Sequence, residues 1–427
     1  MAHKKELLMK ILIINTSEKA GGAAIAANRL AKALNRNGID ATMLVRDRQT
    51  TDNKVLALGS TMRTRFQFVW ERFTIWISNK FDKKRLFLIS FANTGTDITK
   101  LKEFKEADVV HLHWINQGML SLNDINRIVK SGKPVVWTMH DMWPFTGVCH
   151  YNEDCAGYTQ NCGKCQYLRS KSGNDISHKC LKRKEMIYNN SNIAFVACSK
   201  WLKDIAQKSR LLKNKEVVDI PNTIDTDIFK DKDKKSIRER YNLPIDKKLL
   251  LFSSAKISEK RKGLPYLIEA CNILAEKSPD LSKELGVVIL GKNSNESPEI
   301  PFPTYTMNYI KGEKELSDIY NAADLFVTPS LQDNLPNTIM EALACGLPCV
   351  GFNVGGIPEM IGHKTNGYVS EYKSATDLAK GIHWALKEAK YDELKKASIE
   401  KVKKSYSDRI VVEKYMQIYN RLTNKNR

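Results

Sequence analysis

The sequence predicts an α/β protein with two doubly wound domains, and three observations support this. The chain has 427 residues, which suits two domains of roughly 200 residues each. Short apolar runs alternate with helical patterns along most of the chain, as in parallel sheets flanked by helices. After a charged stretch at 231–240 the same alternation starts again. We therefore expect two similar halves that face a cleft.

The first half begins with a buried strand at 10–15, a turn at Gly21 and Gly22, and a helix at 23–35 with apolar side chains near helical spacing. Other apolar runs and helical patterns follow in alternation. Strands are expected at 41–45, 108–113, 134–139, 193–198 and 217–220, with helices at 122–130 and 200–208.

The second half repeats this order. Strands are expected at 249–254, 286–290, 324–328 and 348–351, with helices starting at Leu264, Lys314 and Thr338. From Asp408 onward, Val411, Tyr415, Ile418 and Leu422 share one helical face, so this helix should dock on a core. The expected domains are 1–225 and 226–405, with 406–427 packing back across them.

Composition narrows the class of protein. Hydrophobic residues make up 42% and charged residues 27%, which excludes wholesale disorder, collagen-like chains and disulfide scaffolds. The net charge of +20 favours an acidic partner: nucleic acid, an anionic membrane surface or a phosphate-bearing ligand. There is no apolar stretch of about 18 residues. Lys10 splits the first apolar run, which lacks a signal-peptide cleavage site, so we expect a cytoplasmic protein with reduced thiols.

The stretch 328–342 contains the strongest site signal. Asp333 follows an expected strand, a turn occupies 335–337, and Glu341 lies one turn inside the next helix. The amides at a helix N-terminus bind phosphate, and a nearby carboxylate can accept hydrogen bonds from ribose hydroxyls. The pattern therefore suits a nucleotide sugar, although acid pairs at helix starts also serve as simple dipole partners.

This stretch resembles the Glu-x7-Glu motif of retaining family 4 glycosyltransferases, with Asp333 in the first acidic place and Glu341 in the second. Here the first acid is Asp. Other segments resemble the same family over nearly the whole chain. They are Gly21-Gly22, Thr138-Met139-His140-Asp141, Pro221-Asn222-Thr223-Ile224-Asp225 with Phe229, Lys262-Gly263, and Gly355-Gly356-Ile357-Pro358-Glu359.

The resemblance implies the glycosyltransferase-B (GT-B) fold of two Rossmann-like domains, with the sugar-nucleotide donor in the C-terminal domain and the acceptor against the N-terminal one. It implies catalytic roles for His140, Asp333 and Lys262. Donor contacts are implied for Gly21, Gly22, Lys256, Lys262, Asn337, Thr338 and Glu341. Lys256 is separated from Lys262 by one residue more than in the family pattern.

Some of these residues also have plainer interpretations. His140 could be a core histidine, and Gly21-Gly22 could be an ordinary strand-to-helix turn. Asp225-Thr226-Asp227 spells the metal-binding Asp-x-Asp of another transferase fold. Because it lies in the interdomain segment, we expect solvated turn acids there. Catalysis would then require no metal or other cofactor, with Lys262 and either Lys256 or Arg261 supplying the positive charge.

Four cysteines crowd into the loop 149–165. The final Cys-x2-Cys pair suits a metal site, whereas the first spacing is loose for a standard zinc finger. Two interpretations stay open, structural zinc and reduced thiols. The zinc ligands would be Cys149, Cys155, Cys162 and Cys165.

Basic and aromatic residues are interleaved between Thr61 and Phe91. Seven Lys or Arg residues stand against Glu71 and Asp82, among eight Phe or Trp residues. This composition favours an anionic lipid surface. Packing of an ordinary amphipathic helix on the sheet is the next interpretation, and a single-strand nucleic-acid groove is the third.

Together these observations predict a retaining, metal-independent glycosyltransferase on the inner face of the cell membrane. It would move a sugar from a nucleoside diphosphate to a growing lipid-linked saccharide of a surface polysaccharide such as a capsule or lipopolysaccharide. We expect no nucleic-acid partner. The alternatives are a nucleotide-sugar epimerase or hydrolase on the same fold and, more distantly, a basic nucleic-acid-binding protein.

Overall fold

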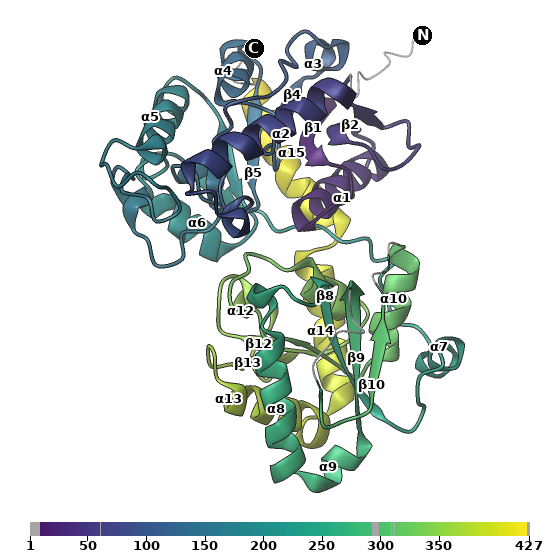
Figure 1. Ribbon diagram of the computed structural model, residues 1–427. Coiled ribbons are helices and arrows are strands. Elements are labelled where there is room, and N and C mark those ends of the chain that lie inside the picture. Colours follow the sequence, from purple (N-terminus) through teal and green to yellow (C-terminus); the bar gives the residue numbers. More distant parts are fainter. Residues whose placement is uncertain (1–8, 60, 293–298, 309, 311, 425–427) are drawn as a thin grey trace, which may run out of the picture. The chain divides into compact units, whose positions relative to one another are not determined.

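The computed structural model describes residues 9–59, 61–292, 299–308, 310 and 312–424. The chain divides into two compact units (Figure 1). The N-terminal unit comprises Met1–Pro221 and Val411–Arg427, and the C-terminal unit comprises Asn222–Ile410. These boundaries lie within about five residues of those expected from the sequence. Lys4 and Lys5, which precede the first apolar run of the sequence, lie outside the described residues.

The N-terminal unit is built on a parallel sheet of seven strands in the order β3-β2-β1-β4-β5-β6-β7. Its strands are β1 (Lys10–Ser17), β2 (Asp40–Asp47), β3 (Val55–Ala57), β4 (Val109–Leu112), β5 (Val135–Met139), β6 (Ala194–Ala197) and β7 (Val217–Asp219). Its helices are α1 (Gly22–Arg36), α2 (Thr61–Ser78), α3 (Lys102–Glu106), α4 (Leu122–Lys130), α5 (Ile176–Asn189), α6 (Lys200–Lys208) and α15 (Asp408–Asn424). Short 3-10 turns lie at Lys83–Arg85, Trp143–Phe145 and Gly157–Thr159.

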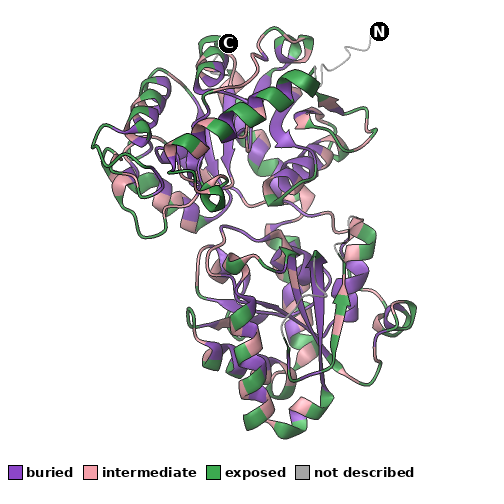
Figure 2. Cartoon of the chain, viewed as in Figure 1, coloured by how far each residue is buried: buried purple, intermediate pink, exposed green. Residues whose placement is uncertain are grey.

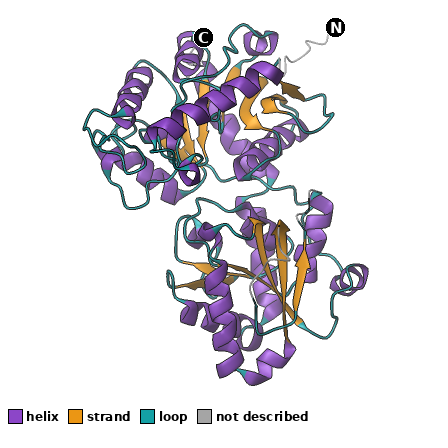
Figure 3. Cartoon of the chain, in the orientation of Figure 1, coloured by secondary structure: helices purple, strands orange, loops and turns teal. Residues whose placement is uncertain are grey.

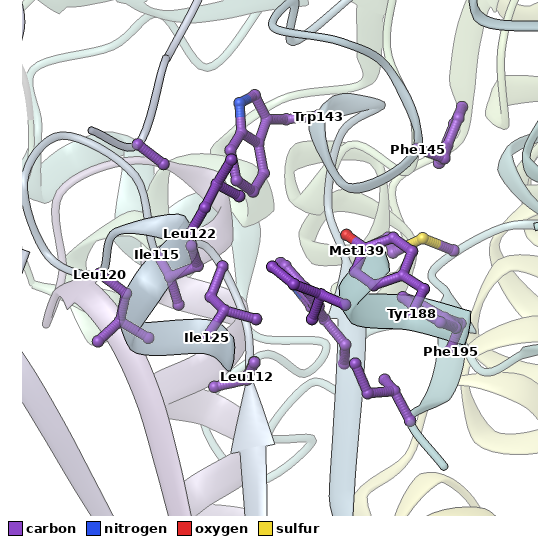
Figure 4. Packing of buried hydrophobic residues seen from close by; sticks show 14 of the residues in the cluster. Leu112, Ile115, Leu120, Leu122, Ile125, Met139, Trp143, Phe145, Tyr188 and Phe195 are labelled. Carbon is purple, nitrogen blue, oxygen red and sulfur yellow. The ribbon is translucent and has the colours of Figure 1, made fainter. Parts of the chain in front are cut away.

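Both faces of this sheet are buried. Leu12 and Ile14 of β1 join one core with α4 and α5, part of which Figure 4 shows around Leu112, Met139 and Trp143. Ile11 and Ile13 point to a second core, which includes Val411, Val412, Tyr415, Ile418 and Tyr419 of α15. Residues that alternate along one strand thus enter opposite cores. The apolar face predicted for the C-terminal helix packs on the N-terminal unit.

The C-terminal unit has a parallel sheet of six strands in the order β10-β9-β8-β11-β12-β13, with helices on its faces (Figure 3). The strands are β8 (Lys248–Lys256), β9 (Leu285–Lys292), β10 (Thr304–Met307), β11 (Leu325–Thr328), β12 (Cys349–Phe352) and β13 (Gly367–Ser370). The helices are α7 (Lys234–Arg240), α8 (Leu264–Lys277), α9 (Pro279–Glu284), α10 (Glu313–Ala322), α11 (Asn337–Ala344), α12 (Ile357–Met360), α13 (Ala375–His383) and α14 (Tyr391–Ser405). A 3-10 turn at Lys260–Lys262 precedes α8, and a π-helical turn at Trp384–Glu388 follows α13.

The two sheets confirm the predicted fold class. Among the described helices, none is both long enough and apolar enough to cross a bilayer.

Candidate functional site

The order of strands in the C-terminal sheet reverses between β8 and β11. The chain runs outward from β8 to β9 and β10, and then returns to start β11 on the other side of β8. In open parallel sheets, the carboxyl ends of strands at such a reversal form a crevice that binds ligands. Lys262 follows β8, and Asp333 and Glu341 follow β11. The predicted charged residues therefore belong to the two segments that follow these strands, with Glu341 already inside α11.

Lys262 and Asp333 form an ion pair, with 2.6 Å between Nζ and Oδ2. Gly263 permits the two loops to approach, because its φ is +73° and a Cβ there would lie 1.8 Å from the carbonyl oxygen of Pro329. Arg261 adds a second cation, with NH1 3.4 Å from Oδ2 of Asp333. The sequence identified these residues separately, and the structure brings them together.

Asp333 is largely shielded from solvent, with 13% of its side chain exposed. Burial acts to raise the pKa of this carboxyl, but the positive charges of Lys262 and Arg261 outweigh burial and hold the pKa below its usual range. The loop backbone is equally constrained, since a Cβ at Gly355 would lie 1.8 Å from the carbonyl oxygen of Asp333. The carboxylate is therefore ionised and held in place at neutral pH.

Glu341 lies inside α11 and is 3% exposed. Its Oε2 accepts a hydrogen bond of 2.8 Å from the hydroxyl of Tyr320, a fully buried residue of α10. Its position in the first turns of α11 agrees with the expected one. The contact with Tyr320 fixes the direction of this carboxylate and gives it a structural function as well.

The N-terminus of α11 lacks a side-chain cap. The first amides of a helix have no partner within the helix and can bind an anion. Asn337 opens this turn, and its Oδ1 accepts a hydrogen bond of 3.0 Å from Nδ2 of Asn222. Thr338 follows in the same turn, and Lys256 is an exposed residue at the end of β8.

Other groups in this unit fit less well as a ligand site. A cavity of about 450 Å³ is not lined by Lys262, Asp333 or Glu341. The three lysines that line it are each paired with an aspartate: Lys232, Lys234 and Lys395. In the Asp-x-Asp segment, Oδ1 of Asp225 accepts from the amides of Asp227 and Ile228, the arrangement of a turn.

The N-terminal sheet reverses between β1 and β4, and Gly21 and Gly22 follow β1. Gly21 has a φ of +95°, which other residues rarely adopt, and no atom lies within 4 Å of the position that a Cβ would take. The glycine turn is therefore required by the backbone, and the space beside it is open.

His140 follows β5, is partly buried and lies next to the buried His113. Its Nε2 lies 2.8 Å from Nδ1 of His113, and its Nδ1 lies 3.5 Å from Sγ of Cys198. Burial lowers the pKa of His140 to about 4, so the ring is neutral at neutral pH. A neutral ring can donate or accept a hydrogen bond to a ligand without carrying charge.

The four cysteines of the 149–165 loop all line one cavity of about 30 Å³. Among the described residues, however, no three His, Cys, Asp or Glu side chains are grouped closely enough to hold a metal ion. Burial raises the pKa of Cys149 to about 12 and that of Cys162 to about 11, so these sulfurs are thiols here. Zinc binding stays a prediction, and it requires the sulfur atoms to draw together.

Two residues that support the candidate site, His113 and Tyr320, were not predicted from the sequence. A signal for His113 existed, because His111 and His113 end a buried strand next to the strand that precedes His140. For Tyr320 there was none, since a tyrosine in an amphipathic helix is an ordinary core residue.

Two family models match the chain in succession. Residues 20–228 match the model described as Glycosyltransferase Family 4, and residues 233–405 match Glycosyl transferases group 1. Between them they leave only residues 229–232 unmatched from 20 to 405. The chain belongs to the family 4 glycosyltransferases. The predicted family is thereby confirmed.

Two relatives in this family align over most of the chain. The D-inositol 3-phosphate glycosyltransferase of Corynebacterium aurimucosum is 25% identical over 87% of this chain and 84% of its own. The putative colanic acid biosynthesis glycosyl transferase WcaC of Escherichia coli is 22% identical over 74% of this chain and 76% of its own. Other matches are shorter: an uncharacterized glycosyltransferase of Haemophilus influenzae is 31% identical, but only 35% of its length is aligned.

Solved structures agree on the fold of this glycosyltransferase. Sucrose-phosphate synthase from Thermosynechococcus elongatus superposes with a TM-score of 0.68 at 16% identity, covering 98% of this chain and 100% of its own. Anabaena HepE in complex with UDP-glucose superposes with a TM-score of 0.62 at 14% identity, and the superposition covers 97% of this chain and 100% of the HepE chain. These likenesses support the GT-B fold.

Proposed function

We propose that this glycosyltransferase transfers a sugar from a nucleoside diphosphate to a lipid-linked saccharide, with retention of the anomeric configuration. The observation that supports a nucleotide-sugar donor is the pairing of Lys262 with Asp333 at the strand reversal, next to the uncapped N-terminus of α11. Cations and helix amides together suit a diphosphate. The names of relatives, which include a colanic acid transferase, support a surface polysaccharide as the product.

In the proposed donor complex, Lys262 and Lys256 contact the diphosphate, as do the amides near Asn337 and Thr338. Glu341 accepts hydrogen bonds from the ribose, and Asp333 contacts the sugar. Because Lys262 is bound to Asp333 in this structure, the diphosphate must compete with that carboxylate for its ammonium group. As the family resemblance implies, His140 contacts the sugar during transfer. Gly21 and Gly22 let the backbone of their turn approach the substrates closely.

For the chemical step we propose a front-face displacement. The bond between the anomeric carbon and the diphosphate oxygen breaks, and the acceptor oxygen forms its bond on the same face. The acceptor proton passes to the departing phosphate. Lys262 stabilises the charge that develops on this phosphate, which is the usual contribution of a fixed cation to such a step. The step requires no metal ion, and the protein would work in the cytoplasm at the membrane surface.

The donor site can be tested by calorimetric titration of nucleoside diphosphates into variants. Lys262→Ala should weaken binding roughly 10- to 100-fold, since a hydrogen bond to a charged group contributes about 1.5–3 kcal/mol. Lys260→Ala is the matched control, because Lys260 is an exposed residue of the same turn. Equal affinity in both variants would contradict the site.

The remaining roles separate in the same experiment. Glu341→Gln should weaken the binding of the bare nucleoside diphosphate as well as the binding of the intact donor. Asp333→Asn removes the carboxylate that competes for Lys262, so this variant should bind the bare diphosphate at least as tightly, while its rate of sugar transfer should fall. His140→Ala should chiefly lower turnover. Transfer that requires an added acceptor supports a glycosyltransferase, whereas donor consumption at the same rate without an acceptor would favour an epimerase or hydrolase.

A further inference from the structure

Helix α2 turns its apolar side chains toward solvent and its polar side chains toward the protein. Its buried residues are Thr64, Gln67, Glu71, Arg72 and Ile75, of which only the last is apolar. Figure 2 shows the helix largely in the colour of exposed residues. A helix that packs on a globular core shows the opposite arrangement. The core-packing interpretation of this segment is therefore wrong for the exposed face.

The inner face is fixed by polar contacts. Nε2 of Gln67 donates to the carbonyl oxygen of Gly95 at 2.6 Å, and its Oε1 accepts from Thr96 at 3.1 Å. Oε1 of Glu71 accepts from the amide of Ala92 at 3.1 Å, and Oε2 lies 3.3 Å from the guanidinium of Arg72. These contacts determine the rotation of the helix about its axis. The outward direction of the apolar side chains is thus a specified feature of the fold.

The outer face of α2 is a continuous apolar surface. Nine of the 13 large hydrophobic side chains that are exposed among the described residues lie between Met62 and Leu88. Aromatic rings contact one another along it, from Phe66 to Trp70 at 6.2 Å and from Trp70 to Phe73 at 6.0 Å between centroids. We define the outer face as Met62, Phe66, Val69, Trp70, Phe73 and Ile77, which are 44–83% exposed.

Positive charge surrounds the outer face. Arg63 and Arg65 are exposed and fall on its two flanks at 3.6 residues per turn. Exposed Lys80, Lys83 and Lys84 follow in the next segment. The acids of this segment do not balance them, because Glu71 is buried and Asp82 is paired with Arg85 at 3.1 Å.

We propose that the outer face of α2 inserts into the interfacial region of an anionic lipid bilayer, with the surrounding lysines and arginines on the lipid headgroups. Phe81, Phe87 and Leu88, also exposed, would extend the contact beyond the helix. Aromatic side chains favour the membrane interface, and basic side chains are attracted to anionic lipid. The purpose of this membrane contact rests on the proposed function: it would hold the enzyme at the surface where a lipid-linked acceptor lies.

Charge decides between this partner and a second copy of the chain. Two outer faces in contact would bring two sets of basic side chains together, which is unfavourable, whereas an anionic bilayer neutralises them. The composition of the outer face also suits a bilayer better than a nucleic acid. Met62, Val69 and Ile77 lie among the aromatic rings, and these aliphatic side chains offer no surface for base stacking.

Co-sedimentation with vesicles tests the proposal. The full chain should bind phosphatidylcholine vesicles that contain phosphatidylglycerol, and binding should weaken with salt. Replacement of Arg63, Arg65, Lys83 and Lys84 by Gln should weaken it roughly fivefold for each charge removed. The matched control replaces exposed Lys235, Lys277, Lys396 and Lys403 by Gln, which changes the net charge equally and should preserve binding.

The apolar contribution needs its own variant. Phe66→Ser with Trp70→Ser and Phe73→Ser should abolish binding, whereas Met186→Ser with Ile245→Ser removes exposed apolar side chains elsewhere and should not. Thermal unfolding confirms that each variant is folded. Tryptophan fluorescence should be quenched by brominated lipid, and Trp70→Phe should reduce that quenching while binding persists.

Three results would overturn the proposal: no vesicle binding, equal binding to pure phosphatidylcholine, or full binding by either α2 variant. A dimer that the apolar variant dissociates would assign the outer face to self-association instead, and oligonucleotide binding lost in the same variant would assign it to nucleic acid. Titration of nucleoside diphosphate into the α2 variants distinguishes failure of the proposed membrane contact from failure of the proposed donor site. Normal titration with failed vesicle binding rejects only the membrane surface, and the reverse rejects only the donor site.

Discussion

Gly263 controls how closely the loops after β8 and β11 approach, because a side chain there would collide with the backbone at Pro329. Gly263→Ala should lower the free energy of unfolding by about 3 kcal/mol or more, through both the collision and the positive φ. Gly38→Ala is the control, since Gly38 has a φ of +80° but no atom within 4 Å of its Cβ position. It should cost only about 1–2 kcal/mol. Denaturant unfolding of both variants measures the difference, and equal losses would refute the role of the close approach.

Three neighbouring histidines, of which His111 and His113 are buried and His140 is partly buried, should make stability depend on pH. Burial lowers the pKa of His111 to about 3 and that of His140 to about 4, and the pKa of His113 is also well below its usual value. In the unfolded chain these side chains bind protons below about pH 6.5. The unfolded state therefore gains protons first as the pH falls.

We expect the free energy of unfolding to decrease from about pH 6.5 toward pH 4, by about 1.4 kcal/mol per pH unit for each histidine. Urea unfolding across this range measures the slope. His111→Gln removes one histidine and should reduce the slope by that amount, whatever its effect on overall stability. A slope unchanged in this variant would show that other groups cause the acid sensitivity.

At the scale of elements, the cysteine loop is the segment whose chemistry is open to direct measurement. If the four cysteines that line one cavity bind zinc, protein purified without added metal should contain about one equivalent. Cys162→Ser should then lower both the metal content and the melting temperature. Cys271→Ser, a buried cysteine of α8 in the other unit, should leave the metal content unchanged. Metal-free protein with unchanged melting would leave reduced thiols as the answer.

The strands show what could be predicted from sequence. The nine interior strands of the two described sheets, including β1, β8 and β11, correspond to apolar runs that were identified, because strands buried on both faces are continuously hydrophobic. The missed strands are β3, β10 and β13, and all three are short strands at sheet edges. One side of an edge strand faces no partner strand, so its sequence carries less of this signal. β7, a fourth edge strand, was found from its apolar run at 217–220.

The candidate site was predictable to a similar degree. Motif resemblance located Lys262, Asp333 and Glu341, but not the ion pair between the first two or the contact of the third with Tyr320. Such contacts depend on which loops the strand order brings together, and that order is a property of the whole sheet. The inverted face of α2 could not be predicted for the same reason, since its polar anchors lie in the separate segment 92–96.

At the scale of the whole molecule, Lys262, Asp333 and Glu341 all lie within 222–410, the C-terminal unit. Its two ends are joined within the unit, for example by the amide of Ile224 and the carbonyl oxygen of Tyr406 at 3.0 Å. The fragment 222–410 should therefore fold alone and bind nucleoside diphosphate with about the affinity of the full chain, within roughly tenfold. Circular dichroism and calorimetry check this. A folded fragment with no affinity would show that the donor site needs the other unit.

The placement of α15 also has a consequence for the order in which the chain folds during translation. The sheet of the N-terminal unit is synthesised first, yet Tyr415 and Tyr419, which cover one of its faces, follow the entire segment 222–410. Until the ribosome has added that segment, the core that contains Val136 and Val196 lacks the side chains that α15 contributes to it. Domains usually fold as they emerge, so the second unit can reach its native state before the first. A nascent chain of this kind is a natural client for chaperones that shield exposed sheet surface.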